Sequence, residues 1–114
     1  MGDISEHFDR SEFACRCGCG LNTVDVDLLG YLVAIRAHFD RPVRISSGCR
    51  CPEHNVAVGG APTSQHLLGR AADISVDGTP PSVVQEYCDQ LGVRGLGRYE
   101  AFTHIDSRSK KARF

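Results

Sequence analysis

The sequence lacks the features that would point to a membrane or to a nucleic acid. No apolar run in its 114 residues approaches the roughly 20 needed to span a bilayer, so we expect no transmembrane segment. The formal net charge is −1, and non-specific nucleic-acid binding requires a basic excess. The opening MGDISEHFDRSEF is polar and acidic, which is unlike a secretory signal. We therefore expect a product that is made in the cytoplasm.

Repeats, linkers and low-complexity segments are also absent. A length of 114 residues suits one domain with one core, and 41% hydrophobic with 24% charged residues is typical of a globular chain. We expect one domain over residues 1–114. The single local basic excess is Arg108, Lys110, Lys111 and Arg113, which predicts either a solvated tail or a weak attraction to an anionic envelope.

Cysteine is plentiful, but its spacing fits no standard framework. Without a secretory signal a disulfide framework is not the default, and Cys-x-Cys-x-Cys is not the usual Cys-x₂-Cys of a structural zinc site. Three states stay open: reduced and partly buried thiols, one or two disulfides, or a second metal. The six residues are Cys15, Cys17, Cys19, Cys49, Cys51 and Cys88.

The apolar pattern predicts alternating helices and short strands. Apolar residues at near-helical spacing favour a helix over 24–39, and Pro at the start with Gly at the end favours another over 80–92. Between them lie glycine-rich loops, with one helical turn after Pro52. The order predicts an α+β fold, in which helices pack on a small, mainly antiparallel sheet. Its strands are expected over 43–48, 70–77 and 101–108.

Three polar residues are candidate metal ligands: His66, Asp73 and His104. A catalytic zinc site takes three nitrogen or oxygen ligands from the protein and keeps one position open for water. Asp73 begins one predicted strand and His104 lies on the next, and facing side chains of paired strands are about 5 Å apart. His66 can fold back over both because Gly69 permits a tight turn.

The segment around these ligands resembles a known signature. The pattern S-x-H-x-x-G-x-A-x-D, with Ser64, His66, Gly69, Ala71 and Asp73, resembles that of the zinc D-alanyl-D-alanine carboxypeptidase family. This family includes phage L-alanyl-D-glutamate endopeptidases and shares its fold with the Hedgehog signalling domain. The segments ISSGCRCPEHNVAVGG, FTHIDSR and FACRCGCG are similar to the family as well, with Cys49 where an aromatic residue is more usual.

The resemblance implies a Hedgehog/DD-peptidase-like fold and assigns roles. His66, Asp73 and His104 match the family's three ligands of one catalytic zinc ion. Arg50 matches an arginine that contacts the carboxylate or the scissile carbonyl of the substrate, where its charge can stabilise an oxyanion. A purely structural salt bridge is the alternative for Arg50. Ser64 either lies near the substrate and the ligands or simply caps a helical turn.

The general base is where the sequence departs from the family. Many members carry a carboxylate three residues before the last histidine, but Ala101 stands there. Glu100 and Asp106 are at even offsets from His104, so both can share its face of a strand. We take Glu100 as the first candidate for the catalytic base and Asp106 as the second. Asp106 can instead orient a histidine ligand.

The resemblance implies zinc-dependent hydrolysis of the peptidoglycan stem peptide, either as a carboxypeptidase or as an endopeptidase. It suggests a monomeric phage-type lysin, made without a signal peptide, that reaches the cell wall through the periplasm or with the virion. No nucleic-acid or transmembrane partner is expected. The alternative is a catalytically inactive, zinc-stabilised binding module of the same fold, since Ala101 replaces the usual carboxylate.

Overall fold

The computed structural model describes residues 2–114 and confirms the α+β class. The described chain has five short strands in one mostly antiparallel sheet, three α-helices and two 3₁₀ helices. None of the helices in residues 2–114 combines the length and apolar character that crossing a bilayer requires. In chain order the elements are η1 (Arg10–Phe13), α1 (Val26–Phe39), β1 (Val43–Ser47), α2 (Pro52–Ala57), η2 (Gln65–Leu68), β2 (Ala71–Val76), α3 (Pro81–Leu91), β3 (Gly95–Arg98), β4 (Thr103–Asp106) and β5 (Ala112–Arg113).

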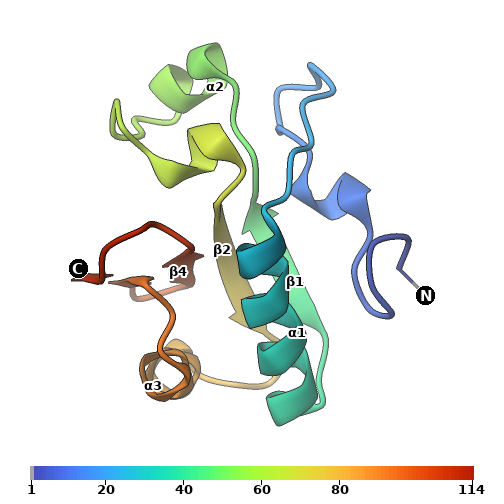
Figure 1. Ribbon diagram of the computed structural model, residues 1–114, viewed down its shortest axis with the longest axis vertical. Helices are drawn as coiled ribbons and strands as arrows, with labels where there is room; N and C mark the ends of the chain where they lie inside the picture. The colour runs from blue at the N-terminus through green and yellow to red at the C-terminus, as the bar shows by residue number, and fades with distance from the viewer. Residues whose placement is uncertain (1) are drawn as a thin grey trace.

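The sheet places β2 and β4 near its middle. The strand order is β1-β2-β4-β3-β5, and every neighbouring pair is antiparallel except β3 with β5. Helix α1 contacts β1 and β2, α3 contacts β2, β3 and β4, and the two helices also contact each other (Figure 1). The two long helices therefore cover the same face of the sheet.

The hydrophobic core fills the space between these helices and the sheet. Leu28, Leu32 and Ile35 of α1 are buried at the i, i+4, i+7 spacing that directs one helix face inward. Ala72 and Ile74 of β2 belong to the same cluster. Because side chains alternate along a strand, the odd-numbered residues of β2 face away from the helices. That second face carries the polar site described below.

The last quarter of the chain contains two strands that the sequence did not predict, β3 and β5. The edge strand β5 pairs with β3, and Arg113 forms an ion pair with Asp89 at 2.9 Å. Arg108 donates to Asp106 at 2.6 Å. The expectation of a solvated basic tail is therefore wrong for these two arginines, because each finds a carboxylate and the backbone of the segment pairs with the sheet.

Asp25 ties the start of α1 to the end of β4. Its carboxylate accepts hydrogen bonds from the amides of Asp27 and Leu28, as an N-cap residue does, and the Ser107 hydroxyl donates to it at 2.6 Å. Partial burial tends to raise the pKa of Asp25, but the hydrogen bonds from Ser107 and Leu28 lower it below the usual value.

Replacing Asp25 with alanine is expected to reduce the free energy of unfolding by about 1–2 kcal/mol, since it removes a helix cap and leaves the Ser107 hydroxyl only the longer contact, 3.5 Å, with the Arg70 carbonyl oxygen. Urea unfolding measures this loss. Asp25→Asn is the control, because asparagine also caps helices. The folded-state pKa of Asp25 is lowered, so its charge-dependent contribution is complete above the unfolded pKa of 3.8 and is lost as the pH falls through the folded value. An equal loss in both variants would contradict the capping role.

Candidate active site

Asp73 and His104 face each other across the central strands. They are directly paired in the β2–β4 ladder, which is the arrangement that the strand pattern predicted. Asp73 Oδ1 lies 3.0 Å from His104 Nδ1 and 3.2 Å from His66 Nε2. All three residues are buried. One carboxylate oxygen thus lies between two imidazole nitrogens.

A tight turn brings His66 to this point. Its short helix η2 ends at Gly69, which has φ of +67° in the left-handed region. A side chain at Gly69 would also come within 2.5 Å of the Thr23 carbonyl oxygen. Glycine is therefore required at this position by both conformation and space.

In each histidine, the ring nitrogen that does not face Asp73 forms a hydrogen bond that fixes the orientation of the ring. His66 Nδ1 donates to the Gly48 carbonyl oxygen at 2.6 Å, and His104 Nε2 donates to Asp106 Oδ2 at 2.7 Å. A carbonyl and a carboxylate can only accept, so these partners fix the proton on those nitrogens. In the neutral imidazoles, Nε2 of His66 and Nδ1 of His104 then direct lone pairs toward Asp73. This is how ligating histidines are oriented in metal sites.

Asp106 is completely buried beneath His104. Its Oδ1 accepts from the backbone amide and Nε of Arg108, and its Oδ2 accepts from His104 and from Arg108 Nη2. Both oxygens therefore already accept two hydrogen bonds each. The close approach is possible because Gly95 on β3 has no side chain there.

The three converging residues fit a metal ion. Their ligand atoms all lie within 4.8 Å of one another. Zinc bound at 2.0–2.1 Å in tetrahedral geometry separates its ligand atoms by about 3.3 Å, close to the two distances to Asp73. Burial tends to raise the pKa of Asp73, but His104 and His66 donate hydrogen bonds to it when their rings are doubly protonated, and these lower that pKa to about 2. A cation would neutralise this carboxylate and accept both imidazole lone pairs.

These residues open onto a pocket of about 410 Å³, and Arg50 lies on its wall. Its guanidinium donates to Ser47 Oγ at 3.2 Å, to Asn55 Oδ1 at 3.2 Å and to Asp73 Oδ2 at 3.4 Å. Both sequence-based interpretations of Arg50 describe part of this arrangement, because it forms a salt bridge and also faces the pocket. Ser64 lines the pocket too, and its hydroxyl accepts from the amide of His66, capping η2.

Glu100 lies on the exposed turn between β3 and β4. Its neighbours Tyr99 and Phe102 line the pocket and stack with ring centroids 4.5 Å apart. Glu100 itself is not part of the pocket wall, and within residues 2–114 the only carboxylate on that wall is Asp73. Of the seven residues singled out in the sequence, five line the pocket: Arg50, Ser64, His66, Asp73 and His104. Asp106 lies behind His104, and Glu100 lies next to the wall without being part of it.

Several pocket residues escaped the sequence analysis. Phe114 lies with its ring centroid 5.2 Å from that of His104, and the Arg108 guanidinium sits 5.3 Å above the Phe114 ring. Phe114 reaches the pocket only because β5 pairs with β3, a pairing without a sequence signal. The Gly48 carbonyl is a backbone group and is likewise invisible in the residue types. The sequence did contain a signal for the ion pair of Arg108 with Asp106, since the two residues are only two positions apart.

Two imidazoles and a carboxylate, buried and lining a pocket, have the composition of the ligand sets found in zinc hydrolases. The family model for Peptidase M15 matches residues 6–106, and the chain belongs to this family. Its members are metallopeptidases, typically with zinc, so the substrate class is a peptide. No curated protein sequence matches the chain.

Proposed function

We propose that this metallopeptidase uses zinc to hydrolyse a peptide bond in the stem peptide of peptidoglycan, as a D-Ala-D-Ala carboxypeptidase or an L-Ala-D-Glu endopeptidase. The observation that carries the proposal is the convergence of His66, Asp73 and His104 at an open pocket. The likeness of FTHIDSR and FACRCGCG to small phage and bacterial members supports a phage-type lysin acting on the cell wall. Residues 1–114 would form one monomeric peptidase domain.

His66, Asp73 and His104 would hold the zinc. The ion would supply Lewis-acid polarisation of the scissile carbonyl and would lower the pKa of a bound water. Gly48 and Asp106 keep the two imidazoles in the required tautomers through their hydrogen bonds.

Arg50 is the proposed group for substrate binding and oxyanion stabilisation. A guanidinium has five N–H donors, and the contacts with Ser47, Asn55 and Asp73 use three of them. The remaining two can bind a terminal carboxylate or the oxygen of the reacting carbonyl. Ser64 would hold the loop that carries His66, through its hydrogen bond to the His66 amide.

The proposed base is Glu100, and Asp106 is proposed as a positioning residue. Asp106 has no exposed surface, and all its hydrogen bonds go to His104 and Arg108, which leaves no place for a water molecule. Glu100 is free in solvent beside two residues of the pocket wall. A carboxylate at this position would accept the proton from the attacking water.

Glu100→Gln is expected to lower kcat by about 10²–10⁴-fold while the zinc content stays unchanged, because the amide cannot accept the proton. Steady-state hydrolysis and elemental analysis measure the two effects. Glu86→Gln makes the same chemical change on an exposed position of α3 and should leave kcat unaltered. Full activity of Glu100→Gln would remove Glu100 from the mechanism.

Digestion of purified peptidoglycan by the zinc-loaded chain tests the function, with products identified by mass spectrometry. Released D-alanine would identify a carboxypeptidase, and a cut after L-alanine would identify an endopeptidase. The chelator-treated chain is the control. A fully zinc-loaded chain without turnover would instead support the second candidate, an inactive zinc-stabilised binding module. That candidate is favoured by one observation: Glu100 lies outside the pocket wall.

A further inference from the structure

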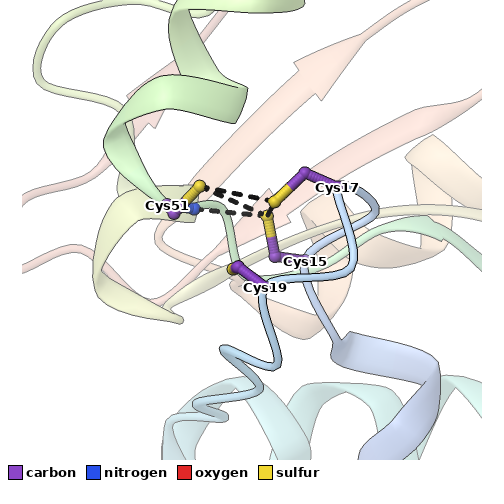
Figure 2. Close-up of side chains that lie close together, drawn as sticks. All are labelled: Cys15, Cys17, Cys19 and Cys51. Atoms are coloured by element: carbon purple, nitrogen blue, oxygen red, sulfur yellow. Dashed lines mark hydrogen bonds between the residues drawn. The ribbon is translucent and has the colours of Figure 1, made fainter.

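Four cysteines form a second cluster (Figure 2), which shares no residue with the active site. Cys15, Cys17 and Cys19 come from the loop that follows η1, and Cys51 immediately precedes α2. Their sulfur atoms all lie within 4.8 Å of one another. The cluster is distinct from the group of His66, Asp73 and His104, so it is a separate candidate site.

The sulfur separations distinguish a metal site from a disulfide. The Sγ–Sγ distances are 3.4 Å for Cys15–Cys17, 3.6 Å for Cys17–Cys51 and 3.8 Å for Cys15–Cys51. A disulfide bond is about 2.05 Å long. Four thiolates around a tetrahedral zinc at about 2.3 Å lie about 3.8 Å apart. The separations among Cys15, Cys17 and Cys51 are therefore close to those of a tetrathiolate site. Cys19 Sγ lies within 4.8 Å of each of them, and all four thiols are free.

Backbone groups around the cluster suit thiolate ligands. The amide of Cys51 donates to Cys15 Sγ at 3.4 Å, and the amide of His54 donates to Cys51 Sγ at 3.4 Å. Such N–H donors stabilise negative charge on sulfur and orient the ligand. Gly18 and Gly20 have φ of +83° and +90°, so the chain turns beside Cys17 and Cys19 in conformations that glycine adopts easily.

We propose that Cys15, Cys17, Cys19 and Cys51 bind a second, structural Zn²⁺ ion. Four protein thiolates leave no open position, which is typical of a structural zinc and not of a catalytic one. Cys15 and Cys51 are buried, whereas Cys17 and Cys19 are exposed and offer the entry path. The Cys-x-Cys-x-Cys spacing alone does not complete such a site, and Cys51 supplies the missing ligand.

This zinc would fasten the N-terminal loop to the segment that supports the active site. Cys51 follows Arg50, which contacts Asp73, and lies three residues after Gly48, which holds His66. The amide of Cys49 already donates to the Phe13 carbonyl oxygen at 2.9 Å. The tetrathiolate site would thus fix the backbone on which these two active-site contacts depend.

Cobalt substitution of the full chain tests the proposal without relying on activity. The metal-free, reduced protein is titrated with Co²⁺, and the near-ultraviolet thiolate-to-cobalt charge-transfer band is recorded. We expect this band to reach its full intensity by two equivalents in the wild type, because the site of His66, Asp73 and His104 also takes up cobalt. The band should be sharply weakened or lost in Cys17→Ser, an exposed substitution that leaves three thiolates. Cys88→Ala removes a core thiol outside the cluster and should retain the band in full. His66→Ala should also retain it, which separates this site from the proposed catalytic zinc.

The number of zinc ions per chain provides a second test of the proposal. With both sites loaded, the wild type should hold about two zinc ions per chain and Cys17→Ser about one. A wild-type chain that binds cobalt without the charge-transfer band would overturn the proposal. So would an unchanged zinc content in Cys17→Ser, or a disulfide between two of the four cysteines in the zinc-loaded protein by mass spectrometry. Because the titration of the wild type needs no variant, misfolding of Cys17→Ser does not obscure the result.

Discussion

His66→Ala will lower kcat/KM for peptide hydrolysis by more than about 10³-fold, equivalent to about 4 kcal/mol of transition-state stabilisation. The reason is that the imidazole is one of three proposed ligands, and its loss leaves only Asp73 and His104 to hold the ion. Elemental analysis should show about one zinc fewer per chain than in the wild type. Kinetics on the cleaved stem peptide and metal content are measured on the same preparation.

The matched control for this variant is His7→Ala, which removes an exposed imidazole outside the pocket. It should keep both the zinc content and the rate. Circular dichroism distinguishes loss of metal from loss of fold in His66→Ala. If the folded variant retained its full zinc and its full rate, His66 would not be a ligand.

Gly95→Ala is expected to reduce the free energy of unfolding by about 3–5 kcal/mol. The added Cβ would come within 1.9 Å of Asp106 Oδ1, and that carboxylate is fully buried and bonded to His104 and Arg108. Relief of the clash requires the carboxylate to move, which leaves buried charges unpaired. Urea unfolding measures the loss.

Gly30→Ala is the control for the Gly95 substitution. Gly30 lies on the exposed side of α1, and a Cβ there meets nothing within 4 Å. Alanine is the better helix former, so this variant should be more stable than the wild type by about 0.5–1 kcal/mol. Equal stability of Gly95→Ala and the wild type would mean that β3 and Asp106 can separate at little cost.

The parts of the fold that the sequence predicted are those with strong local patterns. The helix over 24–39 had a periodic apolar face, and the strand over 70–77 had β-branched residues between a glycine turn and a proline pair. Their positions were enough to anticipate that Asp73 and His104 would meet across a ladder. Gly69 was correctly identified as the turn that returns His66 to them.

The parts that could not be predicted depend on contacts between distant residues. The sequence GLGR of β3 has little strand propensity, and it is a strand because its glycines let Asp106 and His104 approach closely. The cysteine state stayed open because the partner of Cys15 and Cys17 is Cys51, far along the chain. The sequence could not decide between Glu100 and Asp106 as candidate bases, since both occupy even offsets from His104. Their difference in burial appears only in the structure, where Asp106 is enclosed and Glu100 is exposed.

The positions of the proposed ligands and of the pocket walls have a consequence for how relatives of this chain can diverge. Asp73 and His104 belong to the two central strands, where each backbone is hydrogen-bonded on both sides and a substitution disturbs the whole sheet. The surrounding walls come from the loop over 58–64, the turn over 99–102 and the terminal Phe114. Changes at the wall residues of these segments alter what enters the pocket and leave the three proposed ligands in place. Preference for a new peptide can therefore evolve at these wall positions as long as Glu100 and the three proposed ligands are kept.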